Sequence, residues 1–173
     1  DRTPLKLSPE AEKRAPTDLA FPGKVLADAA SKRLFIADTN HHRVIVADLE
    51  TYTIQAVIGG VEPGFTDGDF VAARFNWVHG LTLNGDTLYV ADTGNHALRV
   101  VDLAAGTVTT LAGTGQQNQD WGARLKGGPA LETALNSPWD IVYHENVIYI
   151  AMAGPHQLWT LDLATGQVGP FSG

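Results

Sequence analysis

The 173-residue sequence contains no cysteine, only one methionine and no apolar run long enough to cross a membrane. The lack of cysteine excludes disulfide bonds, thiolate catalysis and zinc–cysteine sites in this chain. Positive charge is also scarce, and the formal net charge of −7 argues against a broad surface for nucleic-acid phosphates. The opening residues, DRTPLKLSPEAEKRAP, lack the apolar core of a secretory signal. We expect a soluble protein of the bacterial cytoplasm or periplasm, with the compartment left open.

Three related segments recur along the chain: LFIADTNHHRVIVADL, LYVADTGNHALRVVDL and IYIAMAGPHQLWTLDL. Counted from Ala37, Ala91 and Ala151, a histidine, an aspartate, a leucine and a glycine return at the same distances in every copy. The repeated polar positions are His42, His96, His156, Asp48, Asp102 and Asp162, and the glycines are Gly59, Gly113 and Gly173. Such a register over three copies indicates a repeat architecture.

Each copy is predicted to hold four short strands, because Val-, Ile-, Leu- and Tyr-rich runs alternate with turn sequences such as NGD, AAGT and ATGQ. The apolar runs are nearly continuous, as expected for a sheet that is covered on both faces. Four-stranded sheets stacked radially make a β-propeller. We therefore predict an all-β fold with three blades, at about residues 21–60, 75–113 and 135–173. Long loops at 60–74 and 114–134 join the blades, and residues 1–20 form a linker or N-terminal extension.

The pattern IADT-x-x-H-R-V followed by a strand resembles the NHL repeat. Over residues 21–173, the strings FPGKV, PGFTDGD, SPWD and AMAGPHQ are similar to the NHL domain of thioredoxin–NHL repeat proteins. This resemblance implies a six-bladed propeller beside a thioredoxin-like domain. No such domain is present in these residues, and there is no cysteine, so the resemblance transfers no redox activity to the chain.

Three blades are too few to close a propeller, which needs about four to eight. An open arc would expose two apolar sheet faces, a liability for a monomer. The sequence therefore leads to two linked expectations: the chain is a piece of a longer protein, and a homodimer or a second half-chain completes a six-bladed ring.

The loops that follow each blade are expected on the same face as the turns that carry the repeated histidines, and any ligand is expected there. The ligand-binding candidates on this face are Lys24, Arg43, Trp77, His79, Trp121, Trp139 and Asp140. The favoured alternative for Trp77 and Trp139 is burial between blades, because aromatic burial dominates core energetics. For Asp140 the alternative is a hydrogen bond to nearby backbone.

The repeated histidines stand one blade apart, so they are not expected to converge on one metal ion. We predict instead that each histidine stabilises its own turn by hydrogen bonds, and that Asp38 and Asp92, each followed by threonine, cap the same turns. The third copy, with Met152 and Ala153 in place of Asp-Thr, must hold its turn differently. TDGD at 66–69 lacks most oxygen ligands of a calcium loop and is predicted to be a turn. No cofactor, metal or catalytic residue is predicted.

The leading functional hypothesis is a noncatalytic scaffold that binds a protein, peptide or glycan on the face with the long loops. The alternative is a propeller enzyme of the lactonase or lyase type, with a channel metal and with ligands supplied by blades absent from this chain. RNA binding is a third hypothesis, which requires Arg43, Arg74, Arg99 and Arg124 to cluster on one face. No membrane partner is expected.

Overall fold

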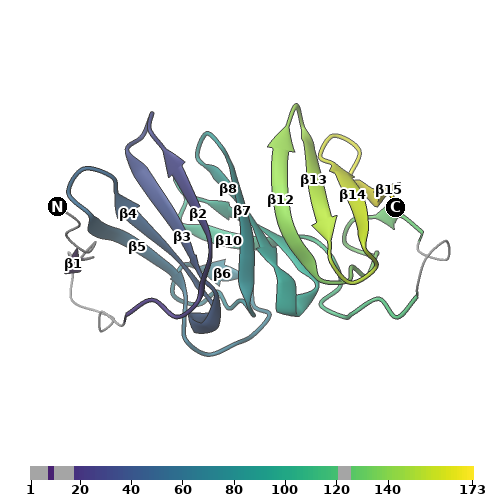
Figure 1. The fold of residues 1–173 in the computed structure, drawn as a ribbon, viewed down its shortest axis with the longest axis horizontal. Helices are drawn as coiled ribbons and strands as arrows, with labels where there is room; N and C mark the ends of the chain where they lie inside the picture. Colours follow the sequence, from purple (N-terminus) through teal and green to yellow (C-terminus); the bar gives the residue numbers. More distant parts are fainter. Residues whose placement is uncertain (1–7, 10–17, 121–125) are drawn as a thin grey trace.

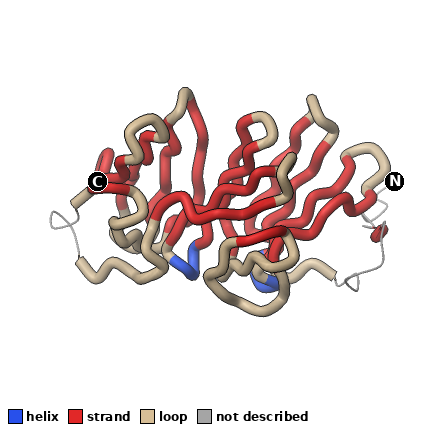
Figure 2. The backbone as a smooth tube through the Cα atoms, turned by 180° about the vertical axis from the view of Figure 1, so that it is seen from behind, coloured by secondary structure: helices blue, strands red, loops and turns tan. Residues whose placement is uncertain are grey.

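The computed structural model describes residues 8–9, 18–120 and 126–173. These residues form three separate β-sheets that lie side by side in an arc (Figures 1 and 2). This is the arrangement that the sequence predicts for the blades of a propeller. The only helices among the described residues are two 3-10 turns, Thr39–His41 and Thr93–Asn95. No helix in this part of the chain is long and apolar enough to span a membrane.

The main strands of each blade follow one another in sequence, from an inner to an outer position. Blade 1 has β2 (Pro22–Asp28), β3 (Arg33–Asp38), β4 (Arg43–Asp48) and β5 (Thr53–Gly59). Blade 2 has β7 (Val78–Asn84), β8 (Thr87–Asp92), β9 (Ala97–Asp102) and β10 (Thr107–Ala112). Blade 3 has β12 (Pro138–His144), β13 (Val147–Met152), β14 (Gln157–Asp162) and β15 (Gln167–Ser172). Adjacent main strands pair antiparallel throughout.

Each sheet has a fifth, two-residue strand that the sequence did not predict. β1 (Ser8–Pro9) pairs parallel with β5, whereas β6 (Gly68–Asp69) and β11 (Gly128–Pro129) pair antiparallel with β10 and β15. The loop after blade 1 therefore runs out to the outer edge of blade 2 before it returns to begin β7. The loop after blade 2 does the same at blade 3. Part of each long loop thus protects a sheet edge from unwanted pairing.

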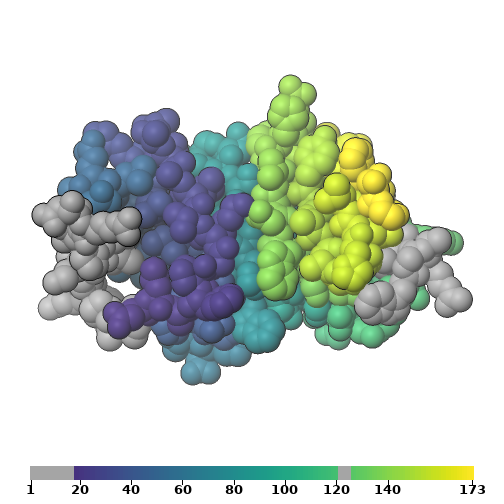
Figure 3. Space-filling view, viewed as in Figure 1, coloured from purple at the N-terminus to yellow at the C-terminus, as the bar shows by residue number. Residues whose placement is uncertain are grey.

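The core lies between neighbouring sheets. One cluster joins blades 1 and 2 and includes Phe35, Val44, Phe75 and Leu81, and a second joins blades 2 and 3 around Trp159. This arrangement explains why the strands are apolar without strict alternation, since both faces of blade 2 are covered. Blades 1 and 3 lie at opposite ends of the molecule with blade 2 between them (Figure 3). Among the described residues each therefore packs against only one other blade, and a separate buried cluster of Leu34, Ile36, Ile45 and Ala47 lies within blade 1.

The two faces of the arc are built differently. At the face where β2, β7 and β12 begin, the Asn95 side chain donates to the carbonyl oxygen of Gly64 at 2.7 Å, and the amide of Gly94 donates to that of Asn76 at 2.8 Å. These bonds tie a histidine-bearing turn to the long loop, so both lie on one face as predicted. On the opposite face the repeated Asp48, Asp102 and Asp162 each accept two backbone N–H groups and stabilise the outer hairpins.

Candidate functional site at the channel mouth

The repeated histidines connect neighbouring blades. His42 Nδ1 in blade 1 accepts the backbone N–H of Trp77 at 3.1 Å, and His96 Nδ1 in blade 2 accepts that of Ser137 at 3.0 Å. Burial lowers the pKa of both imidazoles below the ordinary value, so both rings are neutral at pH 7 and keep an acceptor nitrogen. This differs from the expectation that each ring stabilises its own turn. The ring of His156 makes no hydrogen bond within the described residues.

The threonines of the ADT motif also reach the next blade. Thr39 Oγ1 donates to the carbonyl oxygen of Val78 at 2.6 Å, and Thr93 Oγ1 donates to that of Pro138 at 2.5 Å. Neither 3-10 turn is capped by the side chain of its preceding aspartate, so the predicted Asp cap is wrong. The equivalent residue in blade 3 is Ala153, which lacks this hydroxyl donor.

The aspartates of the same motif hold buried arginines. Asp38 accepts the N–H of Ala20 at 2.7 Å and pairs with Arg43 Nε at 2.7 Å. Asp92 accepts the N–H of Asn76 at 2.7 Å and pairs with Arg99 at 2.9 Å. Both arginines are buried. Arg43 is therefore a structural residue and not, as the sequence suggested, a surface ligand-binding candidate.

The RNA-binding hypothesis needed a surface cluster of arginines. With Arg43 and Arg99 buried, only Arg74 of the described members reaches the surface, and its guanidinium donates to the carbonyl oxygens of residues 71–73. Arg124 lies outside the described residues. The described part of the chain therefore does not form the basic cluster that this hypothesis requires.

The inner strands bring two opposite charges together across the arc. Lys24 Nζ on β2 lies 2.7 Å from Asp140 Oδ2 on β12, and both side chains are partly exposed. The ion pair passes over β7 at Gly80, where an added Cβ would lie 2.7 Å from Asp140 Cα. Glycine at this position lets the three strands approach closely enough for the pair to form. Asp140 also accepts the backbone N–H of Ile141 at 2.9 Å, which is the bond to nearby backbone expected as its alternative role.

An imidazole–indole stack lies on the same inner strands. The rings of His79 on β7 and Trp139 on β12 are 4.1 Å apart between centroids and inclined by 23°. His79 is buried, and this burial lowers its pKa, so the ring is neutral at pH 7. We call this inner-strand surface, with Lys24, His79, Trp139 and Asp140, the channel mouth. It combines one internally compensated ion pair with an uncharged aromatic surface.

The two candidate tryptophans are half exposed, at 54% for Trp77 and 51% for Trp139. The favoured expectation that they pack between blades is therefore wrong for Trp77. Trp139 does stack on His79 of the neighbouring blade, but half of its surface remains exposed. Trp121 lies outside the described residues. The structure thus brings together Lys24, His79, Trp139 and Asp140, and places Trp77 directly before β7 on the same face.

The acidic residues of the TDGD segment are used within the fold. Asp67 accepts hydrogen bonds from Arg99 and Thr110, and Asp69 accepts the backbone N–H groups of Val71 and Ala72. Among the described residues there is no group of three or more His, Asp or Glu side chains arranged to hold a metal ion.

Comparison with known proteins identifies the repeat. Residues 75–101, which include the His96 turn, match the family model described as NHL repeat. The chain is 43% identical over 161 residues, or 88% of its length, to NHL repeat-containing protein 2 of Bos taurus, and 42% identical to that of Homo sapiens. The three blades are therefore NHL-repeat blades.

This NHL-repeat chain is also 44% identical over its whole length to Protein SUPPRESSOR OF QUENCHING 1, chloroplastic, of Arabidopsis thaliana. It spans only 17–22% of these relatives' own lengths. These relatives come from animals and a plant, so they do not support the bacterial location expected from the sequence. A solved protein of unknown function from Bacteroides thetaiotaomicron shares the fold, with a TM-score of 0.69 over 85% of this chain and 34% of its own. Family membership supports a general scaffold or interaction role.

Proposed function

We propose that the NHL-repeat chain is a noncatalytic scaffold that binds a protein, peptide or glycan at the channel mouth, on the face with the long loops. The observation that carries this proposal is the exposure of two tryptophan rings, Trp77 and Trp139, beside a buried neutral histidine and a compensated ion pair. Exposed tryptophan is uncommon on surfaces without a partner, and tryptophan is enriched among residues that dominate binding energy.

The chemistry of the mouth favours a partner that offers apolar or aromatic surface with a few polar groups. Lys24 and Asp140 satisfy each other at 2.7 Å, so neither presents an uncompensated charge. The neutral His79 ring retains hydrogen-bonding nitrogens beside the stacked indole.

We expect Trp77→Ala to weaken partner binding about thirty-fold, because removing a central aromatic anchor costs about 2 kcal/mol or more. Trp77 is the better test position, since Trp139 also borders the open end of blade 3. Binders for the wild-type chain would be selected from a phage-displayed peptide library and a glycan array, and their dissociation constants measured with both proteins.

The matched control is Tyr52→Ala, which removes an aromatic ring of similar exposure from a hairpin on the opposite face. It should leave binding unchanged. Binders that hold Trp77→Ala as tightly as the wild type, or that lose affinity only for Tyr52→Ala, would overturn the assignment of the mouth.

A further inference from the structure

One repeat position, directly before the inner strand of each blade, presents large aromatic side chains to solvent. Phe21 and Trp77 hold this position in blades 1 and 2, and they are 67% and 54% exposed. Both have left-handed backbone angles, with φ of 56° and 53°, a conformation that bulky residues avoid and that glycine and asparagine adopt more readily. Ser137 holds the position in blade 3 with the same φ of 56°, so the fold does not require an aromatic residue there. We call Phe21 and Trp77 the aromatic rim.

The backbone that carries Trp77 is fixed from two sides. Asn76, the residue before it, donates its N–H to Asp92 and accepts the N–H of Gly94. The N–H of Trp77 itself donates to His42 of blade 1 at 3.1 Å. Blade 2 has a neighbour on either side, so the exposure of Trp77 does not depend on where the arc begins or ends. An unfavourable backbone conformation that is held in this way is typical of binding sites.

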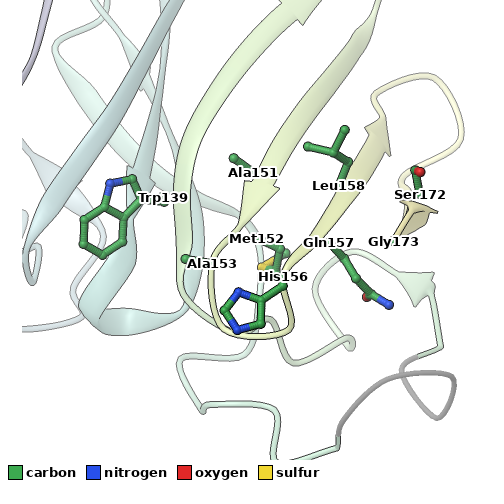
Figure 4. Close-up of a pocket in the computed structure, with 9 residues that line it drawn as sticks. All are labelled: Trp139, Ala151, Met152, Ala153, His156, Gln157, Leu158, Ser172 and Gly173. Carbon is green, nitrogen blue, oxygen red and sulfur yellow. The ribbon is translucent and has the colours of Figure 1, made fainter.

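The next residues of the inner strands add an uncharged polar ring to the rim. Gly23 and His79 follow the two aromatic residues by two positions, and an added Cβ on Gly23 would lie 2.9 Å from His79 Nδ1. The Trp139 indole lies on the side of β12 toward blade 2 (Figure 4) and stacks on the same imidazole. The imidazole is neutral, and neither of its nitrogens is hydrogen-bonded within the part of the chain that the structure describes.

The ion pair of the channel mouth offers a donor and an acceptor side by side. Lys24 and Asp140 remain partly exposed while they contact each other at 2.7 Å. An anionic ligand group would be repelled by Asp140, and a cationic group by Lys24. A hydroxyl group fits best, because one uncharged oxygen can both donate to the carboxylate and accept from the ammonium.

We propose that the ligand of the channel mouth is a neutral oligosaccharide, an inference that rests on the binding role proposed above for this face. The C–H face of a pyranose ring packs on the electron-rich face of an aromatic ring, and its hydroxyl groups bind Lys24, Asp140 and His79. Because the rim residues belong to adjacent blades, more than one sugar unit is needed to contact both. A proline-rich peptide also packs on aromatic rings, but its proline residues have no N–H to donate to Asp140.

The test measures binding of the 173-residue chain to an array of neutral and uronic-acid hexasaccharides and to proline-rich peptides, with dissociation constants from calorimetry. Neutral hexasaccharides should bind and the acidic ones should not. Trp77→Asn should weaken this binding about thirty-fold and Phe21→Asn about ten-fold, because asparagine removes the ring but tolerates the left-handed backbone. Tyr52→Asn is the matched control, since Tyr52 is also an exposed aromatic residue with φ 58° but lies in a hairpin on the opposite face. It should bind as the wild type does.

Asp140→Asn tests the electrostatic part of the site separately. The change leaves Lys24 without its compensating carboxylate, so uronic-acid hexasaccharides should now bind, and high salt should reverse this gain. A residue with only a structural role would not change the preference of the mouth for charge. Circular dichroism would verify that each variant is folded.

The possible outcomes separate this inference from the scaffold function. Peptide binding that is lost in Trp77→Asn, without binding of any neutral hexasaccharide, would overturn the carbohydrate ligand and retain the mouth as a binding site. A wild-type preference for the acidic hexasaccharides would do the same. If no glycan or peptide binds in a way that depends on Trp77, the scaffold function proposed for this face is overturned as well.

Discussion

Replacing Arg99 with methionine is expected to lower the free energy of unfolding by about 3–5 kcal/mol, the usual effect of removing one partner of a buried ion pair. Arg99 is fully buried and pairs with the equally buried Asp92 at 2.9 Å. Its guanidinium also donates to the carbonyl oxygens of Thr66 and Arg74 and to Asp67. One side chain thus joins blade 2 to the loop that precedes it, and methionine fills similar volume without any of these bonds.

The pH dependence of this loss has a defined sign. Burial raises the pKa of Asp92 to about 6. This effect is larger than that of the hydrogen bonds from Asn95, Asn76 and Arg99, which lower the pKa. Because the folded carboxyl binds its proton more tightly than the unfolded one, its contribution to stability falls as the pH rises from about 3.8 to about 6. Without Arg99 this decline should extend to higher pH, so urea titrations should show a larger deficit at pH 8 than at pH 5.

Two controls separate the buried pair from a general effect of losing a positive charge. Adding Asp92→Asn to Arg99→Met should recover part of the lost stability, since no buried charge is left unpaired. Lys32→Met removes an exposed ion pair with Glu50 and should cost less than about 1 kcal/mol. A cost below about 1 kcal/mol for Arg99→Met itself would contradict the role assigned to this residue.

Phe75→Ala is expected to cost about 3–5 kcal/mol, the range measured for buried aromatic side chains. Phe75 comes from the loop before β7, and its ring lies where a Cβ on Gly59 of blade 1 would be only 2.7 Å away. The phenyl ring therefore packs directly on the backbone at the end of β5, and removing it leaves a cavity between two blades. Urea denaturation followed by circular dichroism would measure the loss.

Leu19→Ala tests the same repeat position in blade 1, where no other described blade packs against it. Leu19 is 37% exposed, and its truncation in this chain should change the free energy of unfolding by no more than about 0.5 kcal/mol. Similar costs for Phe75→Ala and Leu19→Ala would show that the position does not act through the preceding blade.

The sequence predicted the blades well because the repeat contains both the apolar runs and the turns that separate them. The second and third strands of all three blades coincide with the three repeated segments to within one residue at either end. The fifth strands were missed, because two-residue pairings such as Gly68–Asp69 are formed by tertiary contact and have no periodicity of their own.

The contacts between blades could be predicted only in part. The repeat identified His42 and His96 as structural, but spacing along the chain cannot show that their acceptors face the next blade. Arg99 had a usable signal that was overlooked. Its repeat counterparts are the buried Ile45 and Trp159, so an arginine at this position requires a buried carboxylate nearby.

The exposure of the tryptophans at the mouth was not predictable from composition. Residue type favoured burial for Trp77 and Trp139. The approach of Lys24 to Asp140 likewise depends on three strands that meet at Gly80, and these residues lie far apart in sequence. Such a site is visible only once the inner strands are placed side by side.

The most direct test of the blade-to-blade contact is amide hydrogen exchange resolved by NMR at pH 7, where His42 and His96 are neutral. Our account predicts slow exchange for the amides of Trp77 and Ser137 at every protein concentration, because each donates to a histidine of the preceding blade. It predicts faster exchange for the amide of Phe21, which holds the same repeat position but donates to no histidine among the described residues. Fast exchange at Trp77 and Ser137, or equal protection of all three amides, would contradict it.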